Sequence, residues 1–282
     1  MLPIADLQSA EGFGQVAASL QTSGFAVMVG HGIEARAFQQ LYESWNQFFT
    51  KADKKSFTAD STSQSGYFSI QNAERAVAAK EQDLKEYFQY WPGTTIPTPQ
   101  KQLTLQIYDQ MFDIAQRILT ALQDHLPART WTRLESPLAE CLSREDTMIR
   151  LLYYPPLSGN EPADAMRAAP HEDINFITLL PAASQQGLEI KPKRSDWQQV
   201  ETSSDSIVVN IGDMLKELTD HELPSTTHRV VNPAKEARQM ARISAPLFCH
   251  PDPSLRLSPE YTAGDYLRDR INEINAQTMK IN

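Results

Sequence analysis

The chain has 282 residues, 41% of them hydrophobic and 22% charged, and its formal net charge at pH 7 is −9. This composition is ordinary for a soluble globular protein of one large domain or two small ones, and an acidic surface that repels phosphate backbones argues against a nucleic-acid partner. The N-terminus shows no signal pattern, no run approaches the roughly 20 apolar residues of a membrane helix, and two cysteines favour a reducing compartment. We therefore expect a cytoplasmic protein without a membrane contact.

Helices dominate the predicted first half of the chain. Residues 2–7 fit a short strand, 11–23 a helix and 24–29 a buried strand, while 51–65 are polar enough for a surface loop. Two amphipathic helices are predicted from apolar residues that recur three or four positions apart. The first carries Phe38, Leu41, Trp45, Phe48 and Phe49, and the second carries Leu103, Ile107, Met111, Ile114, Ile118 and Leu122.

Beyond residue 146 the pattern changes to short strands. The predicted strands are residues 148–154, 176–180, 188–191, 197–200, 206–211 and 241–250. Turn signals such as Gly187, Gly212 and Asn232-Pro233 separate them, which is typical of a β-sandwich or jelly roll. A helix over 262–277 closes the chain, so we predict helices first, a β core second and one further helix.

A metal site is indicated by the segment that contains His171 and Asp173. Side chains two positions apart on an extended chain share a face, so both can meet one ion while Glu172 points elsewhere. A second histidine should come from a neighbouring strand, and His228 fits this role better than His221, which sits in a polar loop. Two histidines and one carboxylate leave one face of a metal open, as in non-haem Fe(II) sites. The spacing alone is weak evidence, because a lone histidine more often makes a structural hydrogen bond.

A cationic anchor for a small anion is predicted at the start of the last strand. Arg242 and Ser244 share one strand face, where a guanidinium and a hydroxyl can hold a carboxylate. Arg238 competes for this role, but its surroundings are typical of a loop, whereas an apolar segment follows Arg242. The alternative for this pair is a surface arginine beside a solvated serine.

Taken together and in order, these motifs resemble the 2-oxoglutarate-dependent Fe(II) oxygenases of the isopenicillin N synthase-like group. The similarity spans most of the chain. In the second half it rests on Leu152-Tyr153-Tyr154-Pro155-Pro156, His171-Glu172-Asp173, Gly187-Leu188-Glu189-Ile190, residues 208–214, residues 225–231 and Arg242-Ile243-Ser244. In the first half it rests on residues 2–7, Gly24-Phe25, His31-Gly32-Ile33, Phe48-Phe49, Lys54-Lys55 and Asp83-Leu84-Lys85-Glu86.

The resemblance implies a fold and a cofactor set. The expected fold is α+β and mainly β: a distorted double-stranded β-helix, or jelly roll, flanked by helices. Residues 1–100 would form an N-terminal extension, and 101–282 the catalytic core with its C-terminal helix. The implied cofactors are Fe(II), 2-oxoglutarate and O2, with ascorbate as a candidate reductant. The iron ligands would be His171, Asp173 and His228.

The resemblance also implies a cosubstrate site, with one departure from the family pattern. Arg242 and Ser244 would bind the distal carboxylate of 2-oxoglutarate, and Tyr154 would donate to it. Many plant members carry an asparagine two positions before this tyrosine, whereas this chain has Leu152. Arg150 is a candidate for replacing the missing contact.

The substrate itself is left open by the sequence. Phe248 and His250 continue the strand face of Arg242 and are candidate substrate-binding residues, with filling of the core as the alternative for Phe248. A small-molecule substrate is expected, and the oligomeric state stays open. Two other functions compete: an Fe(II) oxidase of the same fold that does not use 2-oxoglutarate, and a catalytically silent binding protein.

Overall fold

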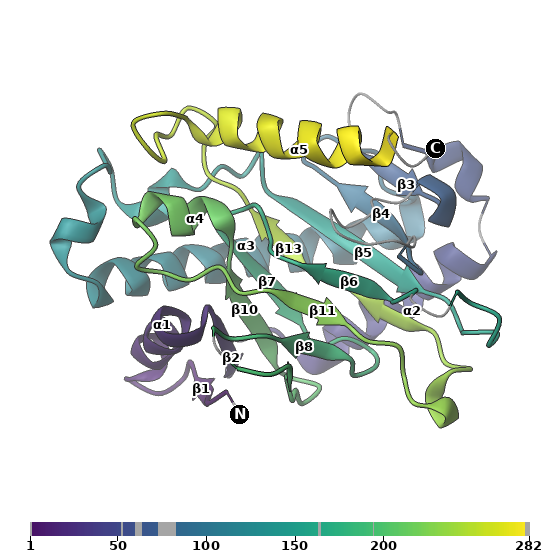
Figure 1. Cartoon of the computed structure of the whole chain (residues 1–282). Helices are drawn as coiled ribbons and strands as arrows, with labels where there is room; N and C mark the ends of the chain where they lie inside the picture. Colours follow the sequence, from purple (N-terminus) through teal and green to yellow (C-terminus); the bar gives the residue numbers. More distant parts are fainter. Residues whose placement is uncertain are drawn as a thin grey trace.

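Two β-sheets face each other, and helices pack outside them (Figure 1). The computed structural model describes residues 2–51, 53–59, 64–72, 83–162, 165–193 and 195–279. Within these residues, no helix combines the length and apolar character that crossing a membrane requires.

The larger sheet has nine strands in the order β1-β2-β10-β7-β13-β5-β4-β3, and β12 pairs with β5 beside β13. Only β1 and β2 pair in parallel, and the other neighbours are antiparallel. The strands are β1 (Ile4–Asp6), β2 (Phe25–Val29), β3 (Gly66–Phe68), β4 (Glu86–Tyr90), β5 (Met148–Tyr154), β7 (Ile177–Pro181), β10 (Ile207–Ile211), β12 (Arg242–Ser244) and β13 (Leu247–Cys249).

The smaller sheet has four strands in the order β6-β11-β8-β9. They are β6 (Ala168–His171), β11 (His228–Val230), β8 (Leu188–Ile190) and β9 (Gln198–Gln199). The pairing of β6 with β11 sets His171 directly opposite His228. This register brings together two residues that lie far apart in the sequence.

The helices cover the larger sheet on its outer side and close the molecule at one edge. Three of them, α1 (Gly12–Ser23), α2 (Ala35–Lys51) and α3 (Thr98–His125), pack on one another and on strands of the larger sheet. Their apolar stripes and the outward face of that sheet form the main hydrophobic core. A short helix, α4 (Asp213–Leu218), follows β10, and α5 (Ala263–Met279) runs along the upper edge of Figure 1.

The jelly-roll prediction is confirmed, although the predicted elements differ from the structure in detail. The predicted strand 241–250 is divided into β12 and β13 around Pro246, which lacks the N–H that a continuous ladder needs. The register against β5 is nevertheless the same on both sides, so Arg242 and Phe248 still share a face. Part of the predicted loop 51–65 is a turn of 3-10 helix at Lys54–Phe57, and residues 52 and 60–63 lie outside the described residues.

Candidate metal centre and anion pocket

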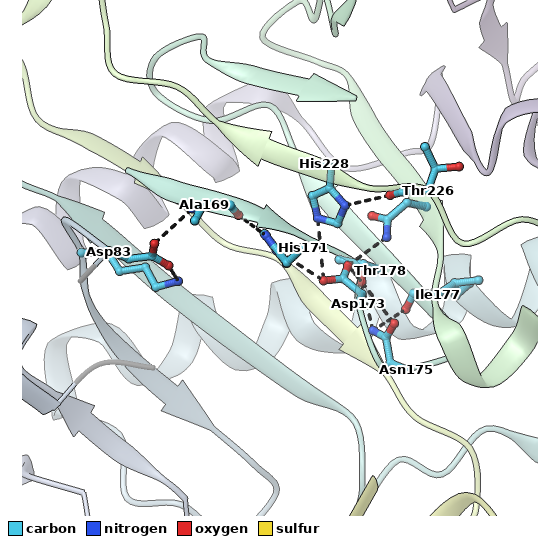
Figure 2. A network of polar contacts seen from close by, with 11 residues as sticks. Asp83, Ala169, His171, Asp173, Asn175, Ile177, Thr178, Thr226 and His228 are labelled. Atoms are coloured by element: carbon cyan, nitrogen blue, oxygen red, sulfur yellow. Dashed lines mark hydrogen bonds and ion pairs between the residues drawn. The ribbon is translucent and has the colours of Figure 1, made fainter. Parts of the chain in front are cut away.

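Three potential ligand atoms converge where the two sheets face each other (Figure 2). One atom each from His171, Asp173 and His228 lies within 4.8 Å of the other two. Both imidazole Nε2 atoms stand 3.8 Å from Asp173 Oδ1, and the two rings are 4.3 Å apart between centroids. Among the described residues, no other group of three or more histidines, cysteines or acids has this arrangement.

Both histidines are held in the tautomer that a metal requires. His171 Nδ1 lies 2.8 Å from the Ala169 carbonyl, and His228 Nδ1 lies 3.2 Å from the Thr226 carbonyl. A carbonyl oxygen can only accept, so each Nδ1 carries the proton and each Nε2 keeps its lone pair. The His228 ring also packs edge-on against Phe25 at 5.5 Å.

Asp173 is oriented by the larger sheet, although its backbone follows the smaller one. Its Oδ2 accepts hydrogen bonds from Thr178 Oγ1 at 2.6 Å and from Asn210 Nδ2 at 2.8 Å. These two donors occupy one carboxylate oxygen, which leaves Oδ1 facing both imidazoles. Burial alone would raise the pKa of Asp173, but the two histidines and these hydrogen bonds bring the pKa below its ordinary value. The carboxylate is therefore ionised at neutral pH.

The backbone after Asp173 is fixed by a close approach to the start of α4. A Cβ on Gly212 would lie 2.1 Å from the Asn175 carbonyl oxygen, so only glycine fits there. The next amide, that of Asp213, donates to the Asp173 carbonyl at 2.7 Å. This contact ties the start of α4 to the segment that carries Asp173.

A buried ion pair from the N-terminal part of the chain reaches the metal site. Asp83 Oδ1 accepts from the Ala169 amide at 3.0 Å, and Asp83 Oδ2 lies 2.7 Å from Lys85 Nζ (Figure 2). Ala169 is also the residue whose carbonyl orients His171. Asp83 and Lys85 belong to a motif that matched the family, but no pattern in the sequence indicates that they touch this strand.

The predicted anion anchor lies in the interior of the protein. Arg242 is 2% exposed, and it donates to the Gln185 carbonyl at 3.0 Å and to Ser244 Oγ at 3.2 Å. Its guanidinium carbon lies 5.1 Å from the ring centroid of Tyr154, the residue opposite it on β5. The rival Arg238 is exposed, in agreement with the prediction that it belongs to a loop.

A recess between the two sheets opens beside Arg242. Its apolar walls come from both sheets and include Leu180, Val208 and Leu188. This space between the sheets places one fixed cation, Arg242, among apolar and polar side chains, an arrangement that can receive an anion.

The candidate substrate residues lie further along the same face. Phe248 stands opposite Thr178 on β7, and its ring centroid is 5.3 Å from the guanidinium carbon of Arg150. Arg150 also contacts Tyr87 and Gln89. The Tyr87 ring itself packs with Leu152 and Tyr154, and the suggestion that Arg150 replaces the contact missing at Leu152 stays a prediction.

His250 is buried at 7% exposure, and its ring lies 5.9 Å from that of Trp91. Burial lowers the pKa of His250 to about 4, so this ring is neutral at pH 7.

The predictions that Glu172 and His221 lie outside the triad hold as well. Glu172 points away from the triad and accepts from Thr227 Oγ1, and the exposed His221 pairs with Glu217 at 3.7 Å.

The protein is thus a jelly roll in which two histidines and one carboxylate form a potential metal site. Residues 145–251 match the 2OG-Fe(II) oxygenase superfamily, and residues 2–112 match the family described as non-haem dioxygenase in morphine synthesis N-terminal. A protein from Shewanella oneidensis, assigned as an oxygenase, has a crystal structure that superposes on this chain with a TM-score of 0.87. The two sequences are 36% identical, and the match covers 97% of this chain and 98% of that one.

More distant relatives agree with this match. A full-length Neurospora crassa protein, crystallised in complex with alpha-KG (2-oxoglutarate), shares the fold at 21% identity and a TM-score of 0.79, with 96% of each chain covered. Scopoletin 8-hydroxylase of Arabidopsis thaliana is 24% identical over 257 residues, which are 87% of this chain and 68% of that protein. The chain belongs to the 2-oxoglutarate/Fe(II) oxygenase superfamily, and its activity is that of a 2-oxoglutarate-dependent dioxygenase.

Proposed function

We propose that His171, Asp173 and His228 hold Fe(II), and that Arg242, Ser244 and Tyr154 hold the distal carboxylate of 2-oxoglutarate. The observation that carries this proposal is the convergence of three ligand atoms within 4.8 Å, with both Nδ1 atoms committed to carbonyls. Two neutral imidazoles and one carboxylate suit ferrous iron and leave coordination positions open. The donor set therefore fits the metal that the family uses.

When bound, iron and 2-oxoglutarate supply the oxidative chemistry, which couples loss of CO2 and formation of succinate to oxidation of a substrate C–H bond. The chain orients the reactants. Thr178 and Asn210 keep Asp173 turned toward the histidines, and the carbonyls of Ala169 and Thr226 keep both rings in one tautomer. Arg242 fixes the cosubstrate from the interior end of the pocket.

The substrate side of the pocket is proposed to include Phe248 and His250. Phe248 lies on the strand face that Arg242 and Ser244 share, and a neutral His250 offers a polar atom without a charge. The His171 side chain is 36% exposed whereas that of His228 is 10% exposed, so the site opens on the His171 side. We propose a small-molecule substrate and a cytoplasmic location, with residues 1–100 serving as an extension to a core at 101–282.

The test uses the whole chain with Fe(II), under exclusion of oxygen. Added 2-oxoglutarate should produce a weak visible charge-transfer band, and Arg242→Ala should need about thirtyfold more 2-oxoglutarate, because truncating a buried charge-assisted contact costs about 2–5 kcal/mol. Arg238→Ala is the matched control and should titrate like the unaltered protein. If Arg238→Ala shows the loss and Arg242→Ala does not, the anchor is misassigned.

A further inference from the structure

A second arginine is buried near Arg242, and nothing in the proposed chemistry yet uses it. Arg167 directly precedes β6, the strand that carries His171, and its relative exposure is 0%. One of its nitrogens, Nη2, donates to the Met240 carbonyl at 2.9 Å. The other two, Nε and Nη1, are buried without any hydrogen-bond partner. A buried guanidinium with two unsatisfied nitrogens is costly, and such groups are usually found paired.

The unsatisfied guanidinium lies close to the anion anchor. Its carbon is 6.0 Å from the ring centroid of Tyr154, and the guanidinium carbon of Arg242 is 5.1 Å from the same centroid. Burial, and then the charge of Arg242, lower the pKa of Arg167 to about 10. The side chain thus remains protonated at neutral pH, and two like charges share one small interior region.

No carboxylate neutralises this pair within the described part of the chain. None of the ion pairs found there involves Arg167 or Arg242. Leu152, the neighbouring residue on the inward face of β5, offers no polar atom and packs with Tyr154 in an apolar cluster. Two cations, one hydroxyl from Ser244 and an apolar wall are the surroundings that a carboxylate at the end of an aliphatic chain would satisfy.

We infer that Arg167 is a second guanidinium of the cosubstrate pocket, and that with Arg242 it selects a 2-oxo acid that ends in a second carboxylate. The inference rests on the proposed function, which assigns this pocket to 2-oxoglutarate. A carboxylate has two oxygens and about four lone-pair positions, so it can accept from Arg242 and from the free Nε or Nη1 of Arg167 together. A 2-oxo acid without the distal carboxylate would leave both cations unpaired.

The experiment compares two ligands of the same chain length by calorimetry on the full chain loaded with Mn(II), which binds such sites without turnover. The ligands are 2-oxoglutarate and 2-oxopentanoate, which lacks the distal carboxylate. Arg167→Met should weaken 2-oxoglutarate about tenfold to a hundredfold, the usual range for a hydrogen bond to a charged group, and should change 2-oxopentanoate about twofold or less. Arg167→Lys should fall between, and Arg238→Met, an exposed arginine from the adjoining loop, should change neither.

Thermal unfolding separates this role from a structural one. Without ligand, Arg167→Met should melt at or above the temperature of the unaltered protein, because an unpaired buried cation has been removed. A residue that merely clamps the 231–241 loop through Met240 would instead melt lower when replaced and would leave the preference for 2-oxoglutarate intact. Equal weakening of both acids in Arg167→Met, or unchanged 2-oxoglutarate binding, overturns the inference. Failure of the unaltered Mn(II) protein to bind 2-oxoglutarate would instead overturn the proposed function itself.

Discussion

Asp83 and His171 are joined through the backbone of one residue. The Asp83 carboxylate accepts from the Ala169 amide at 3.0 Å, and the Ala169 carbonyl accepts from His171 Nδ1 at 2.8 Å (Figure 2). Lys85 pairs with the other oxygen of Asp83. The N-terminal part of the chain therefore helps to orient a proposed iron ligand, and it also contributes strands to the larger sheet.

Asp83→Ala should weaken metal binding and destabilise the fold. The substitution leaves the Ala169 amide without an acceptor and Lys85 buried without a partner, and breaking a buried pair from one side costs about 3–5 kcal/mol. Chemical denaturation and Co(II) titration measure the two effects. The double variant Asp83→Ala/Lys85→Met should recover much of the stability but not the metal affinity. Asp113→Ala, at an exposed position of α3, is the control. If Asp83→Ala binds the metal as tightly as this control does, Asp83 does not position His171.

Each of His171→Ala, Asp173→Ala and His228→Ala should lose bound Fe(II) and abolish turnover. Two protein ligands hold ferrous iron poorly. The main hydrophobic core lies between the helices and the larger sheet, so the fold does not depend on the ion. Metal content after desalting and circular dichroism give the two readouts. His221→Ala, an exposed histidine close by in sequence, should keep both metal and activity. If a triad variant retains as much iron as His221→Ala, the residue replaced in that variant is not an iron ligand.

The free energy of unfolding should fall in mild acid because of His250. Burial lowers its pKa in the folded protein to about 4, below the ordinary value of 6.5, so the unfolded chain binds the proton more tightly. The resulting stability is fully present above pH 6.5 and is lost as pH falls toward 4, by on the order of 3 kcal/mol. His250→Gln should flatten this part of the denaturation profile, while His125→Gln at the end of α3 should not. Equal slopes in His250→Gln and the unaltered protein would mean that the ring is not buried in its neutral form.

Tyr154→Phe should weaken 2-oxoglutarate binding by about 1.5–3 kcal/mol, the size of a hydrogen bond to a charged group. Leu152→Asn probes the same region from the opposite direction. Because Leu152 packs with Phe68, Tyr87 and Tyr154, a buried amide there should cost stability of about 1–3 kcal/mol unless it reaches the cosubstrate. Calorimetric titration checks both variants. Unchanged affinity in Tyr154→Phe would show that the hydroxyl does not face the cosubstrate, and tighter binding in Leu152→Asn would show room for a further donor.

The convergence of His171, Asp173 and His228 could be predicted because most of its geometry is local. His171 and Asp173 lie two positions apart, and the residue types alone restrict the third ligand to a few histidines. The long helices were predictable for a similar reason, since the apolar spacing of α2 and α3 is regular over many turns. The periodicity of the strands alone predicted either a β-sandwich or a jelly roll. The resemblance of several ordered motifs to a known family then favoured the jelly roll.

Other parts of the fold and site lack such a local signal. Strand β6 reads Ala-Ala-Pro-His, a segment with low strand propensity that is extended because β11 pairs with it. Strand β4 is buried throughout and so shows no alternation. Arg167 and Asp83 gain their importance only from contacts with Tyr154 and Ala169, each of which depends on how the sheets face each other.

The most direct test of the account is anaerobic titration of the Fe(II)-loaded chain with 2-oxoglutarate, followed by the visible charge-transfer band. The account predicts that the band saturates at one 2-oxoglutarate per iron, and that admitting oxygen converts the bound acid to succinate and CO2. His171→Ala should give neither the band nor succinate. An unaltered protein that retains iron but shows no band and forms no succinate at any 2-oxoglutarate concentration would contradict the central claim.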